Sequence, residues 1–141
     1  MNQLKEDLRV IIPDLKFREI LKDKYGLVFD SNKTIAYQAI REIRELQISN
    51  SKISSLEGIE MFSSLELLNC ADNLLTNLDV SQNFELEKLN CPNNKLKHLD
   101  ISNNIKLQVL VCSSNDFKTL NVSCNHNLRS LYCEQHIEIQ Y

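Results

Sequence analysis

The sequence contains little glycine, proline or aromatic side chain. Its 141 residues include two glycines, two prolines and no tryptophan, and aromatic residues make up 6%. No low-complexity or Ser/Gly-rich stretch interrupts the chain, which disfavours a flexible linker between two domains. This length suits one domain with a modest core. We therefore expect one continuous fold.

Long apolar segments are also missing. The N-terminal stretch MNQLKEDLRVIIPDLKF has four charged residues before Val10 and no apolar run of signal-peptide length. No later segment approaches a membrane-spanning length. As written, the sequence predicts a soluble, cytoplasmic protein without membrane insertion. If a leader was removed, the alternative is a secreted or surface-exposed protein.

The chain has no excess of positive charge. Its formal net charge is -3, and residues 46–141 contain 7 basic and 11 acidic residues, against 9 and 8 in residues 1–45. An acidic repeat region repels phosphate groups, so nucleic acid is not an expected partner.

What the chain does contain is a repeat. The segments LELLNCADNLLTNLDVSQN, LEKLNCPNNKLKHLDISNN and LQVLVCSSNDFKTLNVSCN start at residues 65, 86 and 107, which is a period of 21. Three columns of identical residues follow this period: Cys70, Cys91, Cys112 and Cys133; Asn73, Asn94 and Asn115; and Asn83, Asn104 and Asn125. A fixed period of this size predicts a solenoid.

The start of each repeat, Leu-x-x-Leu-x-Cys, predicts a short strand. Alternation along the strand turns Leu89 and Cys91 towards the core and Lys88 and Asn90 towards solvent. The returning half of each turn is expected to cover the inner face of the sheet, in this repeat with Leu96, Leu99 and Ile101.

This pattern, Leu-x-x-Leu-x-Cys-x-x-Asn-x-Leu-x-x-Leu-Asp-x-Ser-x-Asn, resembles the bacterial leucine-rich repeats of the cysteine-ladder, internalin-like type over residues 43–133. The resemblance implies an α/β solenoid, a right-handed superhelix with a parallel sheet on its concave face and a helical N-terminal cap. We expect the cap at 1–42. Repeats fill 43–141: one of 22 residues, three of 21 and an incomplete terminal one.

The segments before the cysteine repeats fit this division. The first repeat is predicted to place seven residues in the core, namely Ile43, Leu46, Ile48, Ile53, Leu56, Ile59 and Phe62. In the cap, Pro13 and Gly26 bound a predicted helix that carries Phe17, Ile20 and Leu21 at helical spacing. A second helix is predicted from Thr34, with Ile35, Ala39 and Ile40 facing inward.

The repeated cysteines and asparagines have structural interpretations. Free cysteine behaves as a small apolar side chain, and neighbouring strands about 4.8 Å apart do not suit a disulfide, so the ladder thiols should be reduced. The asparagines of the column that includes Asn94 are expected to bond the turns above and below where the backbone bends.

Neither catalytic nor metal-binding chemistry is expected. The three histidines lie at different repeat positions, and the sequence has no phosphate-binding glycine loop, nucleophile elbow or metalloprotease helix. The loop FDSNKT lacks the glycine and glutamate of a calcium loop. A zinc site at Cys124, His126, Cys133 and His136 is disfavoured because Cys133 belongs to the ladder and His136 replaces a turn asparagine. We expect no enzyme activity and no cofactor.

The concave face is the predicted functional surface. Its variable positions become uncharged and then apolar along the array, and we expect a protein partner, not yet identified, to bind Leu67, Asn69, Lys88, Asn90, Val109, Val111 and Tyr132. Carbohydrate is disfavoured because Tyr132 is the single aromatic residue in these columns. The alternative function is structural. The terminal EQHIEIQY is out of register, and its open sheet edge could join copies into a homo-oligomer.

Overall fold

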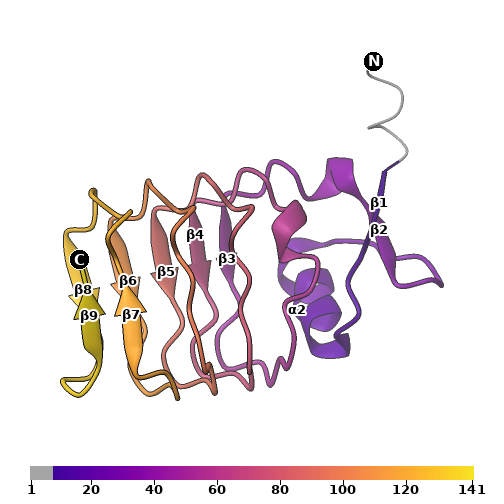
Figure 1. Ribbon diagram of the computed structural model, residues 1–141. Coiled ribbons are helices and arrows are strands. Elements are labelled where there is room, and N and C mark those ends of the chain that lie inside the picture. The colour runs from indigo at the N-terminus through magenta and orange to yellow at the C-terminus, as the bar shows by residue number, and fades with distance from the viewer. Residues whose placement is uncertain (1–7) are drawn as a thin grey trace.

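A five-stranded parallel sheet runs along one side of the molecule (Figure 1). The computed structural model describes residues 8–141. The strands, in spatial order, are β3 (Glu45–Gln47), β4 (Leu67–Asn69), β5 (Lys88–Asn90), β6 (Val109–Val111) and β8 (Ser130–Tyr132). Paired residues are 22 apart between β3 and β4, as in Glu45↔Leu67, and 21 apart afterwards, as in Leu67↔Lys88. This confirms the predicted parallel-sheet solenoid and its register.

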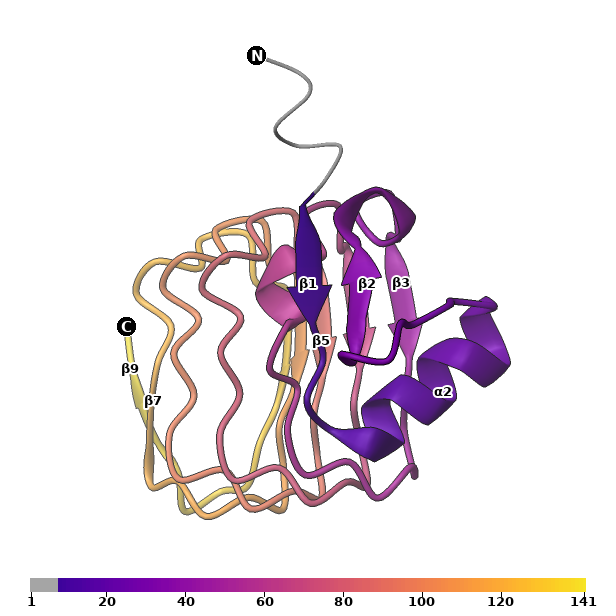
Figure 2. The same ribbon diagram turned by 90° about the vertical axis from the view of Figure 1, so that its right-hand side faces the viewer.

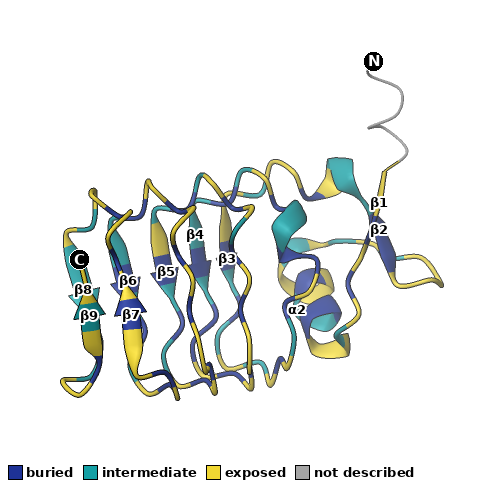
Figure 3. Ribbon diagram, viewed as in Figure 1, coloured by how far each residue is buried: buried dark blue, intermediate teal, exposed yellow. Residues whose placement is uncertain are grey.

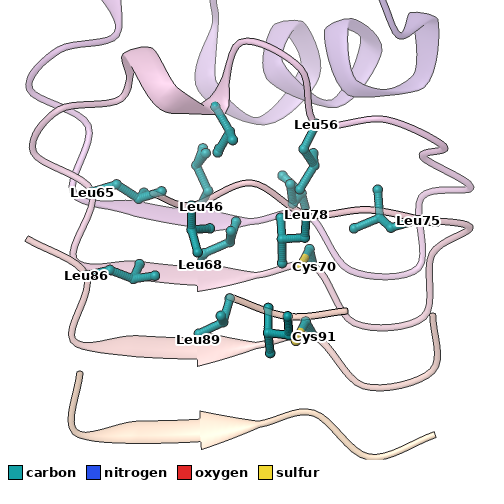
Figure 4. Close-up of a cluster of buried hydrophobic side chains, with 14 of the residues drawn as sticks. Leu46, Leu56, Leu65, Leu68, Cys70, Leu75, Leu78, Leu86, Leu89 and Cys91 are labelled. Atoms are coloured by element: carbon teal, nitrogen blue, oxygen red, sulfur yellow. The ribbon is translucent and has the colours of Figure 1, made fainter. Parts of the chain in front are cut away.

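The core lies between this sheet and the returning half of each turn. The central leucine of each of the first four strands is buried, and the cysteines of successive turns stack beside these leucines (Figure 4). Leu96, Leu99 and Ile101 are buried on the return, as predicted. Residues alternate between buried and exposed all along the array (Figure 3). Each turn is only one strand and one return thick, so its leucines are buried by the turns on either side.

The first repeat differs slightly from the others. Its return includes a short 3₁₀ helix, η2 (Ile59–Met61). Six of its seven predicted core residues are buried, and Ile43 is half-buried against them.

The predicted cap helix is present as α2 (Leu15–Tyr25). Asp14 caps its N-terminus by accepting a hydrogen bond from Phe17 N, and Gly26 ends it in the left-handed conformation. Phe17 and Leu21 are fully buried beneath the helix. The predicted helix and its end at Gly26 are confirmed, but Pro13 precedes the N-cap and does not lie in the first turn.

The second predicted helix is wrong. Thr34 lies instead in β2 (Thr34–Ala36), which pairs antiparallel with β1 (Arg9–Ile11), and a 3₁₀ turn, η1 (Tyr37–Ala39), follows (Figure 2). Ile35 is buried as predicted, but Ala39 is exposed. β-Branched residues suit a paired strand, and the pairing with β1 decides the outcome. Residues 1–7 of the predicted cap lie outside the described residues.

The last turn is shortened. On the return, β7 (Thr119–Asn121) pairs in parallel with β9 (Glu138–Gln140), and Thr119 and Glu138 are 19 residues apart, two fewer than the repeat period. Glu138 stands at the repeat position where a leucine would be buried and is exposed. The slip instead buries Ile137 and half-buries Ile139, which are out of register with the earlier repeats. This confirms the predicted slip of the terminal segment over the last turn.

Candidate partner-binding surface

The seven residues predicted to bind a partner all lie on the solvent-facing side of the five-stranded sheet, which we call the concave face. Strand register puts them in two columns: Leu67, Lys88 and Val109, and Asn69, Asn90, Val111 and Tyr132. Each is a flanking residue of a three-residue strand whose central leucine points into the core. The fold thus brings residues from four repeats onto one surface.

The first half of this surface carries a chain of hydrogen-bonded amides. Asn69 Nδ2 donates to Gln47 Oε1 at 2.9 Å, and Asn90 Nδ2 donates to Asn69 Oδ1 at 3.1 Å. Gln47 in turn donates to Glu45 Oε1 at 2.7 Å. We call Gln47, Asn69 and Asn90 the amide row. The sequence shows these residues in one column, but their mutual bonding was not predicted.

The second half of the surface is apolar. Val111 follows Asn90 in the column and cannot continue the amide row. Val109 and Val111 are half-exposed, and Tyr132, the cross-strand partner of Val111, is 61% exposed. None of the three belongs to the buried core. The surface therefore changes from polar to apolar between β5 and β6.

The cysteine ladder lies on the opposite side of the same strands. Cys70, Cys91 and Cys112 are buried, and all five cysteines are free. Burial raises the pKa of Cys70 and of Cys112 to about 12 and the pKa of Cys91 well above its usual 9.0. These thiols stay protonated at neutral pH, so they pack as apolar groups and are poor nucleophiles.

The turn asparagines bond in one direction along the solenoid. Asn94 Nδ2 donates to Cys91 O of its own turn at 3.2 Å and to Cys70 O of the preceding turn at 3.0 Å, while its Oδ1 accepts from Leu75 N at 3.0 Å. Asn73 and Asn115 bond in the same way. The prediction that each asparagine bonds the turns above and below is therefore corrected, because each amide reaches its own turn and the one before.

The second asparagine column has the same polarity. Asn104 Nδ2 donates to Val80 O at 3.0 Å and to Asn83 O at 2.9 Å, both in the preceding turn. Asn83 and Asn125 repeat this arrangement. The two columns thus tie the second, third and fourth turns each to its N-terminal neighbour.

The residues considered for metal binding are dispersed or already bonded. Cys124 is exposed on the return, whereas Cys133 is half-buried in the ladder. His136 is exposed, and its Nδ1 lies 3.6 Å from Glu134 Oε2. Among residues 8–141, no group of three or more His, Cys, Asp or Glu side chains is placed to hold a metal ion.

Asp30, in the loop considered for calcium, is bonded within the cap. Its carboxylate accepts hydrogen bonds from the hydroxyl and the N–H of Thr34, from Asn32 N and from Arg9. These bonds, that of the Thr34 hydroxyl foremost, lower the pKa of Asp30 to about 2. The carboxylate therefore organises the turn before β2.

The fold of this chain is similar to solved structures of internalins. The functional domain of InlJ from Listeria monocytogenes, which includes a cysteine ladder, matches 93% of this chain with a TM-score of 0.67 and 29% sequence identity. The chain has an internalin-like leucine-rich repeat fold. The internalin InlF from the same organism matches the fold over 84% of the chain, with a TM-score of 0.68 and 23% identity.

The chain spans 34% of the InlJ structure and 38% of the InlF structure. No protein-family model and no curated protein matches its sequence. Within residues 8–141, no helix has the length and apolar character needed to cross a membrane.

Proposed function

We propose that this internalin-like protein recognises a protein partner through its concave face. Val109, Val111 and Tyr132 would form the apolar centre of the contact, and Leu67, Asn69, Lys88 and Asn90 would surround it. The observation that carries the proposal is the pairing of Val111 with Tyr132 on a solvent-facing sheet surface, where folding requires no apolar side chain. Buried aromatic anchors supply much of the affinity of protein interfaces.

The amide row favours the same surface. Because Asn69 and Asn90 are each held by a neighbouring amide, their side chains lose little conformational freedom on binding. Asn90 uses its NH₂ group on Asn69, and within residues 8–141 its Oδ1 accepts no hydrogen bond. A partner could therefore donate to Asn90 while it places an apolar group on Val111.

The experiment is affinity capture followed by measurement of binding to the purified partner. The bait is the intact chain, presented to extracts of the source organism and of its host. Val111→Asp and Tyr132→Ala should each weaken binding by about 2 kcal/mol or more. Both sites face solvent, so the unfolding free energy should change by no more than about 0.5 kcal/mol.

Lys95→Ala is the matched control, because Lys95 is exposed and lies outside the concave face. It should bind like the parent. If Val111→Asp and Tyr132→Ala remain folded and also bind like the parent, the concave face is not the recognition surface.

A further inference from the structure

The amide row on the concave face runs in one direction. Gln47 donates to Glu45 Oε1 at 2.7 Å, and Asn69 donates to Gln47 Oε1 at 2.9 Å. Asn90 Nδ2 then donates to Asn69 Oδ1 at 3.1 Å. A carboxylate only accepts hydrogen bonds, so Glu45 fixes the direction from its end. Each NH₂ group of the row bonds towards the N-terminal side, and the amide oxygen of Asn90 is left at the C-terminal end of the row.

This oxygen lacks both of the donors that serve the oxygen of Asn69. Asn69 Oδ1 accepts from Asn90 in the next turn and from Ala71 N, two residues further along the chain, at 3.3 Å. For Asn90, the residue two further along is Pro92, which has no N–H, and the next residue in the column is Val111, which has no polar side-chain atom. Within residues 8–141, Asn90 Oδ1 therefore has no donor, although the residue is half-buried.

Proline fits position 92 because the strand ladder does not use the N–H there. Cys91 N and Asn93 N, on either side of Pro92, donate to carbonyl groups of the next turn. Alternate residues of a strand bond to opposite sides, so the N–H of the residue between them is not needed for that pairing. In the preceding turn, Ala71 spends this spare N–H on Asn69. Pro92 thus frees one amide oxygen without disturbing the pairing of β5 with β6.

The surroundings of this oxygen favour a neutral donor. The oxygen of each amide in the row lies on the side of the next strand, which for Asn90 is β6, where Val109 and Val111 are half-exposed. A group that covers these valines leaves water, and a charged group would pay heavily for doing so. Lys88 lies two residues before Asn90 on the same side of β5, and within residues 8–141 it has no ion-pair partner. A second cation beside Asn90 would be repelled by Lys88.

We propose, on the basis of the function proposed above, that the partner places the carboxamide of an asparagine or glutamine side chain over Val111 and donates its NH₂ group to Asn90 Oδ1. The row itself shows that one carboxamide spans the spacing between neighbouring strands, since Asn69 is bonded on both sides at 2.9 and 3.1 Å. The group from the partner takes the place that Val111 leaves empty in the row. Glu45 and Pro92 are then positioning residues, because Glu45 orients the amides and Pro92 keeps the last oxygen free.

Val111→Asn tests the fit without any partner, because it puts a carboxamide of the chain itself at the proposed place. In a crystal structure of this variant, the introduced NH₂ group should donate to Asn90 Oδ1 at about 3 Å. An introduced amide that bonds elsewhere, with Asn90 Oδ1 still lacking a donor, overturns the proposal.

Pro92→Ala tests the same oxygen in binding to the purified partner captured with the intact chain. It leaves the seven residues of the proposed contact unchanged but supplies an N–H that can bond Asn90 Oδ1, as Ala71 N bonds Asn69. The Kd should rise about fivefold, which is the loss of one hydrogen bond. Ser113→Ala is the matched control, since Ser113 lies in the column of Pro92 one turn further on, and it should leave the Kd unchanged.

A double-mutant cycle identifies the donor on the partner. Each asparagine and glutamine of the partner is replaced by alanine in turn, and one of these changes should raise the Kd about fivefold with the parent and have no further effect with Pro92→Ala. If Val111→Asp and Tyr132→Ala weaken binding but a folded Pro92→Ala binds like the parent, the concave face is the contact and this inference alone is overturned. A partner in which no carboxamide is coupled to Pro92→Ala also overturns it. Parent-like binding by Val111→Asp and Tyr132→Ala overturns the proposed function as well.

Discussion

The two ends of this solenoid differ in how the core of the outermost turn is covered. At the N-terminal end, residues outside the repeat cover the first turn. Asp14 accepts from Ser54 N, Ser54 Oγ and Ser55 N, with distances of 2.7 to 3.0 Å, and Phe17 stacks on Phe62 with ring centroids 6.2 Å apart. The cap is thus bonded to the first repeat through its backbone, its side chains and its core.

At the C-terminal end, the repeat pattern itself runs out. Both asparagine columns bond towards the N-terminus, so Asn115 and Asn125 tie the fourth turn to the third. His136 stands at the next position of the first column and is exposed beside Glu134. The difference teaches that a repeat buries its leucines only where another turn or a dedicated cap lies beyond it.

Stability should be most sensitive to substitution at the N-terminal end, which the cap covers, and Gly58→Ala should have the largest effect. Gly58 has φ 98°, and a Cβ there would overlap Ile12 Cδ1 and lie 2.7 Å from Ile11 O. The clash and the backbone strain together should lower the unfolding free energy by about 3 kcal/mol. Urea denaturation monitored by circular dichroism measures this change.

Gly26→Ala is the matched control. Gly26 also has positive φ, at 65°, but a Cβ there meets nothing within 4 Å. Its cost should be the conformational one, about 1 kcal/mol. Equal effects of the two substitutions would show that contact between the cap and the first repeat does not matter.

In the middle of the array, Asn94→Ala should lower the unfolding free energy by about 2 kcal/mol, because it leaves buried backbone groups without a hydrogen-bond partner. The groups that lose a partner are Cys70 O, Cys91 O and Leu75 N. Hydrogen exchange should therefore quicken at Leu75, in the preceding turn, more than in the turn of β6. The exposed Asn77→Ala serves as control and should change stability little. Equal quickening on both sides of Asn94 would contradict the one-way bonding.

Asp14→Ala should have the next largest effect, about 1.5 kcal/mol, since it removes both a helix cap and the bonds to Ser54 and Ser55. Burial alone would raise the pKa of Asp14, but the bonds from Phe17, Ser54 and Ser55 together lower it below 3.8. The advantage of the parent over the variant is therefore complete above pH 3.8 and disappears as the pH falls through the lowered pKa. Denaturation curves at neutral and acidic pH test this.

Asp79→Ala is the control for that experiment. The pKa of Asp79 is also lowered, mainly by hydrogen bonds from Ser81 within the same turn. Its loss should change stability by no more than about 0.5 kcal/mol. If Asp14→Ala is as mild as Asp79→Ala, the cap does not depend on the Asp14 bonds.

The smallest expected differences concern the rates at which the five thiols react along the solenoid. Native alkylation followed by mass spectrometry should modify Cys124 first, because it is exposed, and Cys133 second, because it is half-buried at the open end. Cys70, Cys91 and Cys112 should react last, since burial both shields them and raises the pKa of each. Equal rates at Cys133 and Cys91 would mean that the C-terminal end is covered.

Periodicity predicted the array because each repeated residue has the same neighbours in every turn. The period and the alternation along each strand are enough to assign Leu89 and Cys91 to the core and Asn90 to the surface. The helix α2 could be located because its signals are local, namely Pro13, Gly26 and the helical spacing of its apolar residues, although its N-cap, Asp14, was not predicted. Local rules failed at β2, where pairing with the distant β1 outweighs helix propensity.

The surface was predictable to a lesser extent. The strand columns follow from the period, but the bonding within the amide row depends on side-chain rotamers that a sequence does not specify. A further column was missed altogether. Asn50, Asp72, Asn93 and Ser114 all have φ between 50° and 55°, a conformation that asparagine and aspartate tolerate. Three Asn or Asp residues in one column were the available signal, and Ser114 obscured it.

Hydrogen exchange of the parent at a concentration where sedimentation finds a monomer tests the contrast between the ends most directly. Protection should be highest in α2 and from β3 to β5, lower in β6, and lowest in β8 and β9, because each later turn has less structure beyond it. Uniform protection from α2 to β9 in a demonstrated monomer would contradict the account of a closed N-terminal end and an open C-terminal end.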